Sequence, residues 1–174
     1  MLTKNINLKN FKSKFKNQNT KKNLKNLLRD QPKFFESLKP TYKYSYSKKI
    51  ISKYKKISNI RIIGMGGSIL GSEAIYDFLK KKIKKNMTFV NNLNSSADYF
   101  NDKNINLNLI ISKSGNTLET ITNLSALIKK KEKNIIITEE KNNYLTSLTK
   151  KLSAEIFEHK NYIGGRYSVL SEVG

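Results

Sequence analysis

Apolar residues gather in short runs along the chain, beginning near Ile57. The runs are rich in Ile and Val, and they lie at 60–64, 87–91, 107–112, 134–138 and 154–157. Stretches long enough for a helix separate them. Strands that alternate with helices predict a parallel sheet with right-handed crossovers and helices on both faces. We therefore expect an α/β fold built on a doubly wound, five-stranded parallel sheet.

The clearest helical pattern covers residues 117–133, where Thr117 can cap the start and lysines end the stretch. Four apolar residues fall on one face of this helix: Leu118, Ile121, Leu124 and Ile128. A helix after the first strand has a predicted buried face made of Ile69, Ala74, Ile75, Phe78 and Leu79. Asn142 or Asn143 can start a third helix, which carries Leu145, Leu148 and Leu152.

Residues 1–56 differ from the rest, because they are polar with scattered apolar anchors around two prolines. These anchors suit short helices. We therefore divide the chain into an N-terminal helical segment, 1–56, and an α/β domain, 57–174.

The net charge of +21 raises the question of nucleic-acid binding, since clustered cations gain affinity for phosphate backbones by releasing counterions. Only Arg29, Arg61 and Arg166 are arginines, however, and Arg is favoured for bidentate recognition of bases. Lysines are spread along the chain together with many Asn and Ile residues, as compositional bias would produce. We expect no specific nucleic-acid partner, and only non-specific binding to polyanions at low salt.

The chain has no Cys, which excludes disulfides and thiolate metal sites. It also has no apolar run approaching the roughly 18 residues of a membrane helix, and its start lacks the apolar core of a secretory signal. These features favour a cytoplasmic protein with no membrane partner.

Two polar loops follow predicted strands. The stretch "IRIIGMGGSILGSEAIYDF", residues 60–78, places glycines between a strand and a helix, where main-chain N–H groups can approach an anion. The stretch "SKSGNTLET", residues 112–120, offers the hydroxyls of Ser112, Ser114 and Thr117 and a permissive Gly115. Each loop alone could be a tight turn, the second with a capping box from Thr117 to Thr120. Because ligands bind at the carboxyl ends of parallel strands, the two loops together predict a phosphate monoester site that needs no metal or cofactor.

The motifs "GMGGSILGSEA", "SKSGNTLET" and "GGRYSVLSEVG", in this order, resemble the glucose-6-phosphate isomerase family, specifically its first sugar-isomerase domain. The first two motifs alone indicate only the broad sugar-isomerase superfamily, and the third narrows the resemblance to the isomerase. The resemblance covers Ile57 to Gly174. For the sheet we expect the flavodoxin-like strand order, on the basis of the alternation of strands and helices between Ile60 and Phe157.

The resemblance implies a role for each matching residue. Ser112, Ser114 and Thr117 would bind the substrate phosphate with the backbone of Lys113, and Gly67 and Ser68 would line the pocket near the sugar. Arg166 would stabilise an enediolate-like intermediate, a task that suits a guanidinium because it keeps its proton. Glu119 would organise the loop at residues 112–117, which is called the phosphate loop below after this expected role. Glu73 and Glu172 look like ordinary helix acids. His159, the only histidine, is expected to face solvent at the end of the last strand.

The family interconverts glucose 6-phosphate and fructose 6-phosphate, with a hexose 6-phosphate as substrate and a homodimer as the parent protein. Its base glutamate, its catalytic histidine and lysine, and its second domain lie beyond the position of Gly174. We therefore interpret the chain as an N-terminal fragment that is inactive alone. Two other readings stay open: a stand-alone sugar-phosphate-binding module or regulator, and a basic nucleic-acid-associated protein.

Overall fold

The computed structural model describes residues 17–93, 107–129 and 132–174, and it divides the chain into two compact units, 1–32 and 33–174. The first unit contains helix α1, Gln18–Asp30. Asn17 caps this helix, because its side chain accepts a hydrogen bond from Thr20 N at 3.1 Å. No residue of α1 is buried. None of the helices in the described ranges is long and apolar enough to cross a membrane.

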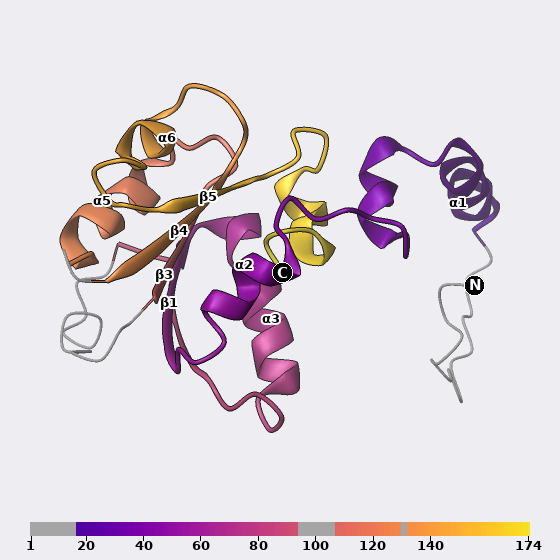
Figure 1. Cartoon of the computed structure of the whole chain (residues 1–174). Coiled ribbons are helices and arrows are strands. Elements are labelled where there is room, and N and C mark those ends of the chain that lie inside the picture. Colours follow the sequence, from indigo (N-terminus) through magenta and orange to yellow (C-terminus); the bar gives the residue numbers. More distant parts are fainter. Residues whose placement is uncertain (1–16, 94–106, 130–131) are drawn as a thin grey trace. The chain divides into compact units, whose positions relative to one another are not determined.

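A single parallel sheet forms the centre of the second unit (Figure 1). Its strands are β1 Asn59–Gly64, β2 Asn86–Val90, β3 Leu107–Ile111, β4 Lys133–Thr138 and β5 Glu155–Glu158. The strand order is β2-β1-β3-β4-β5, and all four pairings are parallel. The predicted five-stranded sheet in flavodoxin-like order is confirmed, and each strand begins and ends within about one residue of its predicted bounds.

Helices cover both faces of the sheet, as the alternation predicted (Figure 1). One face packs against α5 Leu118–Leu127 and α6 Tyr144–Leu148, and the other lies beside α2 Lys48–Lys53 and α3 Leu70–Leu79. Short 3₁₀ helices complete the unit: η1 Lys33–Leu38, η2 Gly66–Ser68 and η3 Gly165–Leu170. Because neighbouring side chains of a strand point to opposite faces, Ile62 and Ile63 belong to different core clusters.

The predicted buried faces of two helices are wrong in part. Phe78 is 88% exposed on α3, and Leu118 is 71% exposed at the start of α5. The buried residues of α5 are Thr120, Asn123, Leu124 and Leu127. A long-range polar contact accompanies this orientation, because Asn123 Nδ2 donates to the carbonyl of Asn92 at 2.9 Å. The helix is also shorter than predicted, since Ile128 has extended backbone angles.

A buried polar ladder crosses the middle of the sheet. Arg61, Asn108 and Asn134 are register partners on β1, β3 and β4, and all three are buried. Arg61 Nη1 donates to Asn108 Oδ1 at 3.3 Å and to the carbonyl of Leu127, at the end of α5, at 3.0 Å. The Glu132 carboxylate lies 3.8 Å from the same nitrogen. The arginine therefore joins the sheet to the end of α5, opposite the helix start that carries the phosphate loop.

Candidate functional site

The loop after β3 brings three predicted hydroxyls together. The Ser112 and Thr117 hydroxyl oxygens lie 2.8 Å apart, and the Ser114 hydroxyl lies 3.5 Å from each. Ser112 is buried, whereas Ser114 is exposed. The amides of Gly115 and Asn116 donate to the Ser112 and Ser114 hydroxyls, at 3.1 and 3.2 Å. The loop thus has the buried hydroxyl of Ser112 at its base and the exposed Ser114 at its surface.

Gly115 permits this loop conformation. Its φ is +70°, a left-handed value that side chains disfavour, and an added Cβ would lie 2.0 Å from Asn143 Oδ1. Asn143 caps α6 through a capping box with Thr146, as the predicted helix start required. Tyr144 N donates to Asn116 Oδ1 at 2.8 Å. The start of α6 therefore packs directly against the phosphate loop. Asn143 lies so close to Gly115 that no side chain would fit at position 115.

The capping box from Thr117 to Thr120 does not form, although Gly115 N closes a turn on the carbonyl of Ser112 at 3.1 Å. Thr117 occupies the N-cap position of α5, but its side chain makes no capping hydrogen bond and instead contacts Ser112. Thr120 is buried, and its hydroxyl has no hydrogen-bond partner among the described residues. The amides of the first turn of α5 thus have no side-chain acceptor from Thr117 and are suited to an anion.

The side chain of Lys113 points into the structure next to the loop. Its ammonium donates to the carbonyl of Asn161 at 2.6 Å and lies 3.5 Å from Glu139 Oε1. Its own carbonyl accepts from Glu139 N at 3.1 Å and from the Thr138 hydroxyl at 3.3 Å. Burial by itself would raise the pKa of the Glu139 carboxyl, but Lys141 and Lys113 outweigh burial and hold that pKa below its usual value.

The glycine loop, residues 64–68 after β1, lies against the segment that carries Arg166, residues 161–168, which is called the arginine segment below. An added Cβ on Gly67 would lie 2.3 Å from the carbonyl oxygen of Gly165, so only glycine allows this approach. The Ser168 hydroxyl bridges the two segments, since it lies 2.9 Å from Gly67 O and 2.7 Å from Gly165 O. Sequence reasoning missed Ser168 as a contact, although it stands inside the quoted "GGRYS" motif.

The register of the sheet sets the two loops side by side. Gly64, the last residue of β1, pairs with Ile111, the last residue of β3, so the glycine loop and the phosphate loop leave neighbouring strands at the same edge. Ser68 ends the 3₁₀ turn η2 in the glycine loop, and its N donates to Met65 O at 3.1 Å. Both loops therefore begin at one edge of the sheet.

Arg166 is exposed at the start of η3. Within the part of the chain that the structure describes, its guanidinium makes no hydrogen bond or ion pair. The neighbouring Tyr167 stacks on Phe34, with ring centroids 4.2 Å apart and planes 15° apart. The backbone of the arginine segment is thus anchored, while the guanidinium keeps its donors available.

Two expectations about titratable residues are wrong. His159 is 1% exposed, with Nδ1 lying 3.0 Å from the carbonyl of Lys160, and burial lowers its pKa. Glu172 belongs to no helix and is buried; it accepts hydrogen bonds from the Tyr42 hydroxyl at 2.9 and 3.1 Å and from Ser45 N at 3.1 Å. The partners of Glu172 are distant in sequence, and the backbone N of His159 donates to Thr138 O at 2.7 Å, so local patterns do not report either burial. Glu73, by contrast, lies in the first turn of α3 as expected.

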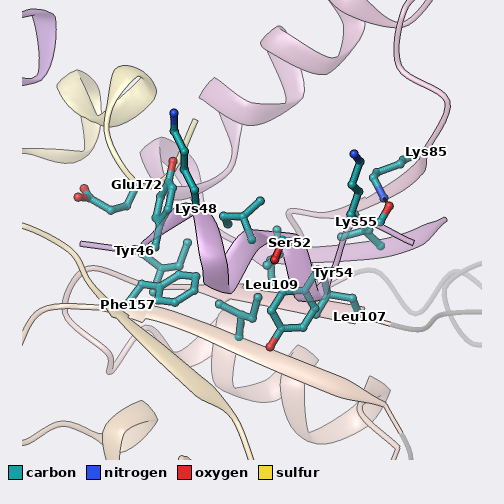
Figure 2. Close-up of a pocket in the computed structure, with 14 residues that line it drawn as sticks. Tyr46, Lys48, Ser52, Tyr54, Lys55, Lys85, Leu107, Leu109, Phe157 and Glu172 are labelled. Carbon is teal, nitrogen blue, oxygen red and sulfur yellow. Dashed lines mark hydrogen bonds between the residues drawn. The ribbon is translucent and has the colours of Figure 1, made fainter. Parts of the chain in front are cut away.

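A separate apolar cavity of about 510 Å³ lies between α2 and the sheet (Figure 2). Leu107, Leu109 and Phe157 line it from the sheet, and Tyr46 and Tyr54 line it from the segment around α2 (Figure 2). None of the predicted site residues lines it. Its apolar walls do not suit a sugar phosphate, so we assign the candidate site to the loops and not to this cavity.

The family model described as phosphoglucose isomerase matches residues 33–174. Curated relatives agree with it. A glucose-6-phosphate isomerase of Borreliella afzelii is 40% identical over 139 residues, which cover 69% of this chain and 26% of the relative. A glucose-6-phosphate isomerase of Methanocaldococcus jannaschii is 36% identical over 146 residues, covering 71% of this chain and 34% of the relative. The chain thus spans only about a quarter to a third of the length of these relatives.

Solved structures share the fold at low sequence identity. A hypothetical protein from Thermus thermophilus aligns over 86% of this chain and 36% of its own with a TM-score of 0.63 and 19% identity. A tagatose-6-phosphate ketose/aldose isomerase from Escherichia coli aligns over 86% of this chain and 41% of its own with a TM-score of 0.52 and 15% identity. These likenesses concern the fold, whereas the family model concerns the sequence over most of the chain. This chain belongs to the phosphoglucose isomerase family.

Proposed function

We propose that this chain is the phosphosugar-binding part of a glucose-6-phosphate isomerase, which interconverts glucose 6-phosphate and fructose 6-phosphate. The observation that carries the proposal is the cluster of hydroxyls from Ser112, Ser114 and Thr117 at the start of α5. Hydroxyls and unpaired helix amides are donors that a phosphate dianion needs, and together they bind it without a metal.

Each loop has its own task in this proposal. The hydroxyls of Ser112, Ser114 and Thr117 hold the phosphate, with the main chain of Lys113 beside it. Gly67 and Ser68 approach the sugar from the neighbouring glycine loop, where the absence of a Cβ at Gly67 lets the segment that carries Arg166 pack against this loop. Hydrogen bonds to the phosphate would fix the C6 end of the substrate and thereby orient C1 and C2, where the reaction takes place.

Arg166 would act on the reacting carbons. Moving a proton between C1 and C2 generates negative charge on the sugar oxygens, and a positioned guanidinium stabilises that charge more in the transition state than in the ground state. The exposed guanidinium of Arg166, on an anchored backbone beside the glycine loop, fits this role. The base that moves the proton would come from another part of the longer protein. We further propose that the longer protein is a cytoplasmic homodimer.

Binding by the 174-residue chain tests the proposal. We expect it to bind glucose 6-phosphate, and we expect Thr117→Ala to weaken binding by about 0.5–1.5 kcal/mol, the net value of one hydrogen bond. Isothermal titration calorimetry measures the change. Thr149→Ala is the matched control, because Thr149 caps the end of α6, where its hydroxyl donates to Leu145 O, and it contacts none of the three loop hydroxyls.

The outcome separates the readings. Equal affinity of wild type and Thr117→Ala would remove Thr117 from the site, and no binding by the wild-type chain would contradict the proposal. A phosphorylated carboxylate that imitates the enediolate charge separates the two readings, because only an isomerase part has an intermediate to stabilise. Equal affinity of the wild type and Arg166→Ala for this carboxylate would favour a sugar-phosphate-binding module.

A further inference from the structure

The Lys113 side chain connects two loops that the proposed function keeps apart. Lys113 belongs to the phosphate loop, and Asn161, whose carbonyl it binds at 2.6 Å, belongs to the segment leading to Arg166. The two residues are 48 positions apart in sequence. The ammonium therefore ties the phosphate grip to the segment that carries the guanidinium.

Further contacts hold both the backbone and the ammonium of Lys113 in place. Two donors, Glu139 N and the Thr138 hydroxyl, hold the carbonyl of Lys113 against the end of β4. Glu139 also supplies the counter-charge to the ammonium, at 3.5 Å, and the Glu139 side chain is only 14% exposed. The ammonium is thus engaged with protein groups, the Asn161 carbonyl and the Glu139 carboxylate. Its effect on a bound ligand would pass through the position of other groups.

The segment between Asn161 and Ser168 is held at both ends. Lys113 holds its first residue, and the Ser168 hydroxyl holds the far end to Gly67 O at 2.9 Å. The phosphate loop, the arginine segment and the glycine loop are thus connected in series by two side chains. Arg166 lies between the two fastenings, so its place relative to the phosphate depends on both.

We propose that Lys113 is a positioning residue that sets the distance between the bound phosphate and Arg166. The inference rests on the proposed function. Loss of the ammonium would free the Asn161 end of the segment, and the guanidinium would no longer meet the reacting end of a ligand whose phosphate is fixed. A misplacement of about 1 Å is enough to weaken such an interaction strongly.

Two phosphorylated ligands isolate this effect. Arabinonate 5-phosphate carries a carboxylate where the enediolate charge would develop, and arabinitol 5-phosphate carries a neutral hydroxyl there. The ratio of their dissociation constants, measured by calorimetry on the 174-residue chain, reports the interaction with Arg166. For the wild-type chain we expect the acid to bind roughly tenfold to a hundredfold more tightly than the alcohol, as a charge-assisted hydrogen bond gives.

The variants then form a double-mutant cycle. Lys113→Met should lower the ratio to that of Arg166→Ala, and the double variant should lower it no further, because both changes remove the same interaction. Lys113→Arg should restore the ratio to within about threefold of wild type, since a guanidinium keeps the charge and several donors. Lys141→Met is the matched control: Lys141 pairs with the same Glu139, at 2.5 Å, without bonding to Asn161, and its removal should leave the ratio unchanged.

Each result has one meaning. If Lys113→Met lowers the ratio equally with and without Arg166, the ammonium acts on the ligand directly and the positioning role is overturned. If the wild-type chain binds neither ligand, the proposed function fails, and this inference with it. Should Lys113→Met not fold, Glu139→Gln is the second variant. It removes the counter-charge of the Lys113 ammonium but keeps the backbone N–H of residue 139, which donates to the Lys113 carbonyl. It should lower the ratio as well, and an unchanged ratio would overturn the proposal.

Discussion

Replacing Gly67 with alanine tests whether the glycine loop and the arginine segment touch as the structure shows. The added Cβ would lie 2.3 Å from the oxygen, 2.4 Å from the carbonyl carbon and 2.7 Å from the Cα of Gly165. All three atoms are backbone, so no side chain can rotate away. To reach an ordinary contact of about 3.4 Å, the two segments must separate by about 1 Å.

The cost of that separation has two parts. Overpacking of this kind costs about 1–3 kcal/mol. The Ser168 hydroxyl, which now lies 2.9 Å from Gly67 O and 2.7 Å from Gly165 O, would lose one of these bonds, worth about 0.5–1.5 kcal/mol. A total of about 1.5–4.5 kcal/mol lowers the melting temperature of a chain this size by about 3–18 °C. The same shift would move Arg166 and reduce its contribution to ligand binding.

Thermal unfolding followed by circular dichroism measures the effect, and Gly164→Ala provides the control. Gly164 has φ −71° and ψ 153°, values that alanine adopts, and the nearest atom to an added Cβ is Tyr167 Cδ2 at an ordinary 3.6 Å. This control should be neutral or stabilising by about 0.4–1 kcal/mol. If Gly67→Ala melts at the same temperature as Gly164→Ala, the close approach of the two loops is refuted.

Two further predictions concern buried charged or titratable groups. Burial lowers the pKa of His159, and the positive charge of Lys113 lowers it further, so the unfolded chain takes up a proton at higher pH than the folded chain does. Between about pH 6.5 and 5, above the range in which carboxyl groups titrate, the free energy of unfolding should therefore fall by at most about 1.4 kcal/mol per pH unit as the pH drops. His159→Gln should abolish this fall in urea titrations over the same pH range. Since His159 is the only histidine, a fall that survives there in the variant would contradict the assignment. Arg61→Met should lower the free energy of unfolding by about 3–5 kcal/mol, because it leaves the buried Glu132 carboxylate without its cation. Lys53→Met breaks an exposed ion pair and should lower it by no more than about 1 kcal/mol in the same titrations. Equal losses for the two variants would refute the role of the buried ladder.

Local sequence determined the elements of this fold. The five strands follow from apolar runs of strand length, and the start of α6 follows from Asn143, whose side chain and backbone complete the capping box. The clustering of hydroxyls followed from their spacing, because residues 112, 114 and 117 lie on one turn that leads into a helix. Such features depend on residues within a few positions of one another, so a pattern along the chain contains the information needed to predict them.

Tertiary structure decided which side chains are buried and what they contact. Apolar spacing predicted burial of Leu118 and Phe78, yet both are exposed, while His159 and Glu172 are buried against expectation. A polar side chain is stable in the interior only where a partner forms hydrogen bonds with it. The partners of Glu172 lie more than a hundred positions away in sequence. The tie between Lys113 and Asn161 has the same origin. Strand order and register bring such partners together, and these become known only when the whole sheet has formed.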